Sequence, residues 1–131
     1  MAAQQHPVEV IMARGLMSNM TTPAFLVDNG GTLIFFNEAA GELLGVRFEE
    51  AGPMAADEWG GRFRPTAVDG RPLTLEELPL AIAMNEARPA HSLMRIVSAV
   101  GKKQDIEVTA FPIVGRTGQS ASLAIFWDRS G

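Results

Sequence analysis

The segment TPAFLVDNGGTLIFFNEAAGELLG, residues 22–45, decides the fold of this chain. It opens with an apolar run at residues 25–27, followed by Asp28-Asn29-Gly30-Gly31 and a second apolar run at residues 32–36. Asn and Gly tolerate the positive φ angles of tight turns, so Asn-Gly between two apolar runs predicts a β-hairpin.

A short helix is predicted directly after the hairpin. Asn37 is a good N-cap residue, and Glu38 is favourably placed in the first turn, where the helix dipole stabilises negative charge. Gly45 ends the helix. Its apolar face is formed by Ala40, Leu43 and Leu44.

This order of strand, tight turn, strand and capped helix resembles the opening of a PAS domain, a sensory module of many signalling proteins. PAS sequences typically combine D-x-x-G in the turn with N-x-A-x-x-x-x-G in the helix. The matching residues are Asp28, Gly31, Asn37, Ala39 or Ala40, and Gly45. The resemblance extends over about residues 22–130 and is closest to bacterial PAS proteins, either free-standing or excised from a longer chain. The form of the N-terminus favours the free-standing protein.

The composition is that of one globular domain. The chain has 131 residues, 47% of them hydrophobic, and a net charge of −4. This charge argues against binding to nucleic acid. The absence of cysteine removes disulfides, thiolate metal sites and cysteine nucleophiles. No signal peptide and no apolar run of about 20 residues is present, so a cytoplasmic location without membrane contact is expected.

Residues 1–21 are expected to carry a separate helix, over residues 8–20, and residues 22–131 the PAS domain. Pro7 at the helix start and Pro23 after its end support these limits. The helix has an apolar stripe, which packs either on the sheet of the domain or across a homodimer. The residues predicted for a dimer interface are Val8, Ile11, Met12, Leu16, Leu123, Ile125 and Trp127.

The middle of the chain predicts short helical turns at about residues 48–52 and 55–59. Residues 74–77 have the capping-box form T-x-x-E, which favours a turn over residues 75–78. A helix is then expected over residues 79–87, with Pro79 at its first position. The segment DGRPLTLEELPLAIAM is similar to one found in PAS domains of bacterial histidine kinases and phosphatase regulators, where it forms the long helix that faces the ligand pocket.

Three strands are predicted to follow, at residues 90–99, 104–114 and 120–127. The resemblance then implies an α+β PAS fold with a five-stranded antiparallel sheet in the order 2-1-5-4-3. Helices are expected on one face, with the N-terminal helix on or near the other. The last strand is apolar on both faces, so the helix over residues 8–20 or a second subunit should cover its outer face.

The resemblance implies a pocket between the sheet and the helix at residues 79–87. The pocket holds a small apolar ligand, or it is a filled core and the domain is a ligand-free interaction scaffold. The residues predicted to form it are Phe36, Trp59, Phe63, Leu80, Met84, Met94, Ile96, Phe111 and Phe126.

No cofactor is required by the sequence. His6 and His91 are the only imidazoles and lack metal-binding spacing, so no metal site is predicted. Haem in PAS domains is commonly held by a histidine on the long helix, and residues 79–87 contain none. Haem would depend on His91, with Met84 or Met94 as a sixth ligand. The photoactive flavin type needs a cysteine that is absent here, whereas a redox flavin does not.

The chain is expected to be non-catalytic, because no nucleophile elbow, Walker loop or dinucleotide fingerprint is present. The alternative is a small enzyme that uses Glu107 as an acid or base in an apolar pocket. Glu107 would then need a partner such as Arg62, Arg64 or Arg95. The alternation of the strand leaves open whether Glu107 faces the pocket or the outer side.

The C-terminal sequence Asp128-Arg129-Ser130 resembles the Asp-x-Thr-like end through which PAS domains pass conformational change to a following segment. Asp128 and Ser130 are therefore the predicted relay residues. Together these expectations describe a homodimeric sensor and interaction module that signals to an effector in cis or in trans.

Overall fold

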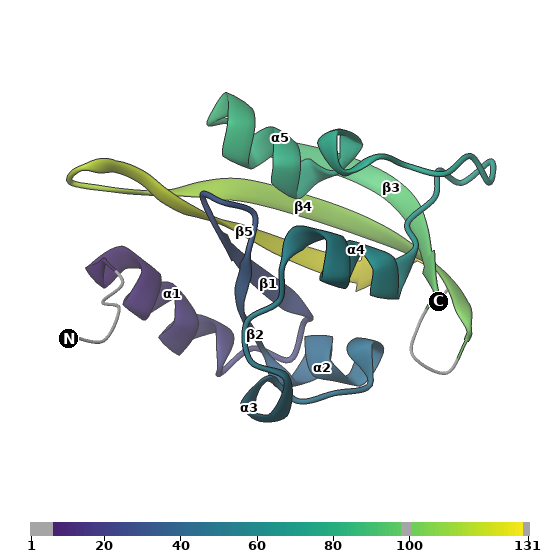
Figure 1. Ribbon diagram of the computed structural model, residues 1–131, viewed down its shortest axis with the longest axis horizontal. Helices are drawn as coiled ribbons and strands as arrows, with labels where there is room; N and C mark the ends of the chain where they lie inside the picture. Colours follow the sequence, from purple (N-terminus) through teal and green to yellow (C-terminus); the bar gives the residue numbers. More distant parts are fainter. Residues whose placement is uncertain (1–6, 98–100, 130–131) are drawn as a thin grey trace.

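The computed structural model describes residues 7–97 and 101–129 and contains one five-stranded antiparallel sheet (Figure 1). The strand order β2-β1-β5-β4-β3 confirms the predicted fold class and topology. The strands are β1 (Ala24–Asp28), β2 (Leu33–Phe36), β3 (Ala90–Val97), β4 (Lys103–Gly115) and β5 (Gly118–Asp128).

The hairpin between β1 and β2 has the predicted turn chemistry. Asp28 Oδ1 accepts hydrogen bonds from the backbone N–H groups of Gly30 (2.9 Å) and Thr32 (3.0 Å). Gly31 has a φ of 87°, in the left-handed region that favours glycine. The turn therefore needs these residue types at these positions.

The helices divide between the two faces of the sheet. In the described residues, α2, α3, α4 and α5 pack on the inner face and α1 packs on the outer face, with strands between α1 and α5 (Figure 1). The helices are α1 (Val8–Met17), α2 (Glu38–Leu44), α3 (Phe48–Ala51), α4 (Ala56–Phe63), the 3-10 helix η1 (Leu75–Glu77) and α5 (Pro79–Glu86). None of the helices in residues 7–97 and 101–129 combines the length and apolar character that membrane crossing requires.

Two helices differ from their predicted limits. The first, α1, ends at Met17 because Ser18 and Asn19 hydrogen-bond back to the carbonyls of Arg14 and Gly15, at 2.9 and 3.0 Å. The other, α4, runs on to Phe63, although two glycines in its middle lower its helix propensity. The burial of Trp59 in the inner apolar cluster outweighs that weak propensity.

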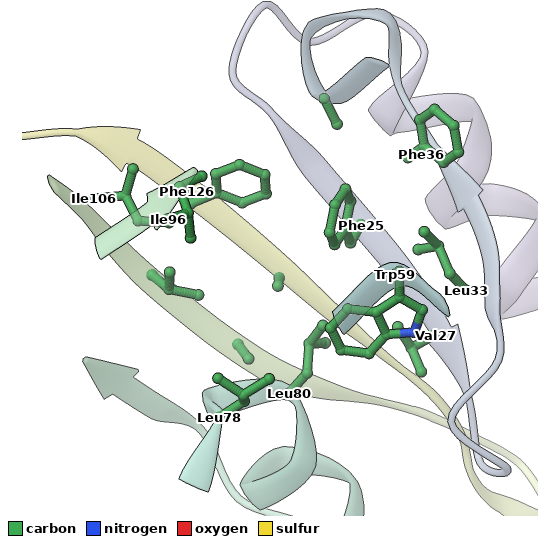
Figure 2. Packing of buried hydrophobic residues seen from close by; sticks show 14 of the residues in the cluster. Phe25, Val27, Leu33, Phe36, Trp59, Leu78, Leu80, Ile96, Ile106 and Phe126 are labelled. Carbon is green, nitrogen blue, oxygen red and sulfur yellow. The ribbon is translucent and has the colours of Figure 1, made fainter. Parts of the chain in front are cut away.

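Two apolar clusters, one on each face, form the core. The inner cluster lies between the sheet and α2, α4 and α5, and Figure 2 shows its close packing. The outer cluster lies between the sheet and α1. Residues 121–124 of β5 are all buried because both faces of the strand are covered there. The apolar character of β5 on both faces thus reflects cover by α1.

Candidate functional site

The inner cluster borders a partly open apolar cavity of about 50 Å³. Its walls come from β1, β3, β4, β5, α4 and the start of α5. Five of the predicted pocket residues line it, namely Trp59, Leu80, Met94, Ile96 and Phe126. Sequence reasoning therefore located the inner face of the sheet and the helix that covers it.

Phe25 is the hub of the aromatic packing beside this cavity. Its ring makes edge contacts with Phe36, Trp59 and Phe126 at centroid distances of 6.3, 6.2 and 5.2 Å (Figure 2). The indole N–H of Trp59 donates to the carbonyl of Gly31 at 3.2 Å. Among the side chains that line the cavity, this is the only N–H or O–H group, and the hairpin turn already occupies it. The cavity thus offers a ligand apolar contact without hydrogen bonding.

The other predicted pocket residues have different positions. Phe36 is buried in the inner cluster without lining the cavity, and Met84 packs against the cluster half-buried. The side chain of Phe63 lies outside the described part of the structure. The prediction for Phe111 is corrected, because Phe111 packs with the outer cluster, opposite Leu123 of β5.

The register of β4 explains the position of Phe111 and decides that of Glu107. Ile106, Val108 and Ala110 point into the inner cluster, so the residues between them lie on the outer face. Glu107 Oε2 there is 2.9 Å from His91 Nε2, and Glu107 Oε1 is 3.6 Å from Arg129. The alternative of an acid in an apolar pocket is therefore wrong for Glu107.

His91 also lies on the outer face, where its Nδ1 is 2.8 Å from Thr109 Oγ1. This position is on the far side of the sheet from the cavity, so the haem arrangement that depends on His91 does not fit. His6 lies outside the described residues. Within residues 7–97 and 101–129, no three acidic, histidine or cysteine side chains group as metal ligands would.

Helix α1 has one face on the sheet and one face in solvent. Val10, Ala13 and Met17 are buried against the outer face. The opposite side exposes the four apolar residues of the predicted stripe, each 58 to 68% accessible. We call this set the α1 stripe, which consists of Val8, Ile11, Met12 and Leu16.

The sheet residues predicted for a dimer interface divide into covered and open positions. Leu123 is only 4% exposed beneath α1, which corrects its prediction, because a second subunit has no access to it. Ile125 is half-buried, and Trp127 is 46% exposed, close to the end of β5. Leu93 of β3, which the sequence analysis did not single out, is exposed on the same face, since Leu93, Glu107 and Trp127 are aligned across three strands.

Contacts on the two flanks of α1 fix its orientation. On one flank, Glu9 Oε2 accepts a 2.7 Å hydrogen bond from Ser120 Oγ of β5. On the other flank, the guanidinium of Arg14 lies 4.6 Å from the ring centre of Phe35 in β2. Leu16 follows Glu9 by seven residues and shares its flank, which points toward β4 and β3. The α1 stripe therefore borders the open part of the outer face.

Asn37 joins α1 to the rest of the domain. Its Oδ1 accepts hydrogen bonds from the backbone N–H groups of Ala24 and Ala40, both at 3.1 Å. Its Nδ2 donates to the carbonyls of Met17 (3.1 Å) and Thr22 (2.9 Å). The sequence predicted the cap on α2. The contacts with Met17, Thr22 and Ala24 depend on tertiary packing, which no local sequence pattern predicts.

The start of β5 joins the two layers in a second place. Gln119 Nε2 donates to the carbonyl of Ala83 in α5 (3.1 Å) and to Ser122 Oγ (3.2 Å). Its neighbour Ser120 bonds Glu9 of α1 on the other face. Consecutive strand residues point to opposite faces, so two adjacent side chains connect an inner helix and an outer helix. Sequence reasoning missed both residues.

The predicted relay residues lie at the end of β5. Asp128 is exposed and pairs in register with Ile106 of β4, and Ser130 lies outside the described residues. The backbone N–H of Arg129 donates to the carbonyl of Asp105 at 2.8 Å, which continues the pairing one residue beyond the strand.

A protein-family model described as PAS domain matches residues 13–85. No curated protein sequence matches the chain significantly. Among solved structures, the PAS domain of Bordetella pertussis BvgS is similar at 13% identity and a TM-score of 0.62, covering 92% of this chain and 84% of that chain.

Two further structures show the same likeness. A PAS domain from Colwellia psychrerythraea has 19% identity and a TM-score of 0.63, over 91% of this chain and 96% of that one. The Rhodobacter sphaeroides LOV protein has 16% identity and a TM-score of 0.69, over 95% of this chain and 71% of that one. At these identities the likeness concerns the fold.

Proposed function

This chain belongs to the PAS domain family, and on that premise we propose that it is a non-catalytic, homodimeric sensor and interaction module of signal transduction. The observation that carries the proposal is the α1 stripe, four large apolar side chains more than half exposed on one helix. Exposed apolar surface of this extent on a small domain usually marks an interaction site. Residues 1–21 would then supply the interaction element and residues 22–131 the sensory domain.

The size of the interface supports a contribution from the sheet as well as from α1. A helix of ten residues is about 15 Å long and about 10 Å across. Its free side is much smaller than the about 800 Å² that each partner of a stable interface usually buries. Trp127 of β5 and Leu93 of β3 are two further exposed apolar side chains on the same face, on either side of Glu107. We therefore assign the interface to the α1 stripe together with Ile125, Trp127 and Leu93.

The size and lining of the inner cavity support the proposal of a ligand that is small, uncharged and apolar. About 50 Å³ is enough for a few atoms, since a water needs at least about 10–15 Å³ measured in this way. A larger ligand requires the walls to move, and Met94 in the wall and Met84 beside it have flexible side chains that repack readily. The alternative of a ligand-free scaffold rests on the same small volume.

The contacts of Gln119 and Ser120 support a route between the two faces. A ligand that displaces α5 would act on Gln119 through the carbonyl of Ala83. The adjacent Ser120 would carry the displacement to Glu9 and α1, where the dimer contact changes. Such a ligand shifts the population of two arrangements by its differential affinity for them. An effector protein or domain, reached in cis beyond Asp128 or in trans, would read the result.

Native mass spectrometry of the purified protein tests this function directly. We expect a dimer, and any mass retained beyond two polypeptides would identify a ligand. A dimer of unmodified mass that also takes up no xenon or benzene would favour the ligand-free scaffold. A monomer at all concentrations would contradict the homodimeric module.

A further inference from the structure

Gly15 occupies a position in α1 where nothing within the subunit requires glycine. A Cβ added there would meet no atom within 4 Å, and the residue has ordinary helical geometry. Glycine in a helix interior lowers helix stability relative to alanine. Two other glycines of the chain are closely surrounded by neighbouring atoms, whereas Gly61 in α4 is as open as Gly15. A Cβ on Gly41 would lie 2.9 Å from the carbonyl oxygen of Val46, and one on Gly115 would collide with the carboxylate of Glu9.

Gly15 lies in the middle of the α1 stripe. It follows Ile11 by four residues and Met12 by three, so these side chains are its neighbours on the helix surface. Leu16 and Val8 border the same side. The missing side chain leaves a hollow on the exposed face of α1, surrounded by apolar side chains that are more than half exposed.

We propose that the α1 helices of two subunits cross at Gly15, with an apolar side chain of the second copy seated in this hollow. The inference rests on the proposed homodimer and specifies where its helices meet. A residue without a Cβ permits close approach of another backbone, which accounts for a glycine that the single subunit does not need.

The charges on the molecule favour a second copy as the occupant. The five positions of this face, the α1 stripe and Gly15, carry no charge, while the charged residues of α1 are engaged on its flanks with Ser120 and Phe35. The chain as a whole has a net charge of −4, so two copies repel each other weakly overall. A two-fold contact through an uncharged apolar face adds nothing to this repulsion.

Sedimentation equilibrium on Gly15→Leu tests the crossing. Leucine adds apolar surface to the stripe, so a merely adhesive patch would bind a second copy more tightly. A crossing at Gly15 predicts the opposite, a dissociation constant at least about tenfold higher, because the side chain fills the hollow. Gly61→Leu is the matched control, since Gly61 is also an exposed glycine inside a helix with no atom within 4 Å of an added Cβ. The dissociation constant of the Gly61→Leu dimer should equal that of the wild type.

Gly15→Ala provides a second variant that favours the helix and needs no new packing in the subunit. We expect a dissociation constant a few-fold higher than that of the wild type, with an unchanged circular dichroism spectrum. A wild-type dimer whose strength is equal or greater in both Gly15 variants would overturn the crossing while leaving the homodimer in place. A wild-type monomer would instead overturn the homodimer on which the inference rests.

Discussion

The two faces of the sheet differ in how completely they are covered, and Phe126 and Trp127 show this in adjacent positions. Phe126 points into the inner cluster and is buried, whereas Trp127 points outward and is 46% exposed. The inner face packs against α2, α4 and α5, while the outer face has the single helix α1 over β1, β2 and part of β5. Inner positions should therefore determine stability, and open outer positions should determine association.

The largest contrast is expected between alanine substitutions at these two neighbours. Phe126→Ala should lower the free energy of unfolding by about 3–5 kcal/mol, because it removes a buried ring and leaves a cavity. Trp127→Ala should cost about 1 kcal/mol or less in the monomer, since much of the side chain already contacts water. Urea unfolding at low protein concentration gives both values. Similar losses for the two variants would contradict the comparison.

Asn37 belongs to neither face alone, since it joins the end of α1 to β1 and α2. Asn37→Ala would remove four hydrogen bonds in a buried place, so we expect a loss of about 2–4 kcal/mol in unfolding free energy. Asn29→Ala, which removes one exposed hydrogen bond to the carbonyl of Gln119, should cost less than about 1 kcal/mol. Equal effects in urea unfolding would show that Asn37 does not hold α1.

Removal of the contact between Ser120 and Glu9 tests how much this hydrogen bond stabilises α1 against local unfolding. Ser120→Ala removes one hydrogen bond to a carboxylate in a half-buried place, worth about 1 kcal/mol. Hydrogen exchange of the α1 amides should then accelerate about fivefold, with little change in α5. Thr117→Ala in the exposed hairpin turn is the control and should leave both helices unchanged. Acceleration in α5 alone would contradict the assigned contact.

We also expect the stability of the domain to depend on pH through one ion pair on the outer face. The Arg95 guanidinium donates hydrogen bonds to Asp105 at 2.6 and 3.3 Å, which lowers the pKa of that carboxyl below its ordinary 3.8. This contribution to stability is present above the ordinary pKa and is lost as the pH falls through the lowered value. In an NMR titration, Arg95→Gln should raise the midpoint of Asp105. Arg71→Gln, which removes a partner of Glu77, should leave Asp105 unchanged.

The hairpin and the helix cap could be predicted from the sequence because they depend on local chemistry. Asp28, Gly31 and Asn37 act through neighbouring backbone groups, and a resemblance to PAS domains supplied the topology. The capping box was equally readable, since the Thr74 backbone N–H donates to the Glu77 carboxylate at 2.9 Å.

The face of β4 could not be predicted, because the alternation fits both registers. Ile106 and Val108 are apolar, but Thr109 and Phe111 on the other face are compatible with burial too. Only the pairing with β5 decides which set points inward. The error at Phe111 and the open question at Glu107 have this common cause.

The difference between Leu123 and Trp127 was also beyond the sequence. Both lie on the outer face of β5, and the path of α1 alone determines which of them is covered. That path depends on contacts between distant residues, such as Glu9 with Ser120 and Met17 with Asn37. No local sequence pattern predicts these contacts.

The most direct test of the difference between the two faces is sedimentation velocity over a range of concentrations on Ile11→Glu. Ile11 is exposed on the α1 stripe, so a charge there should leave the subunit folded and make it monomeric where the wild type is dimeric. Val68→Glu, at another exposed apolar residue in a loop, should remain dimeric. A dimer of undiminished strength in Ile11→Glu would contradict the assignment of association to the outer face.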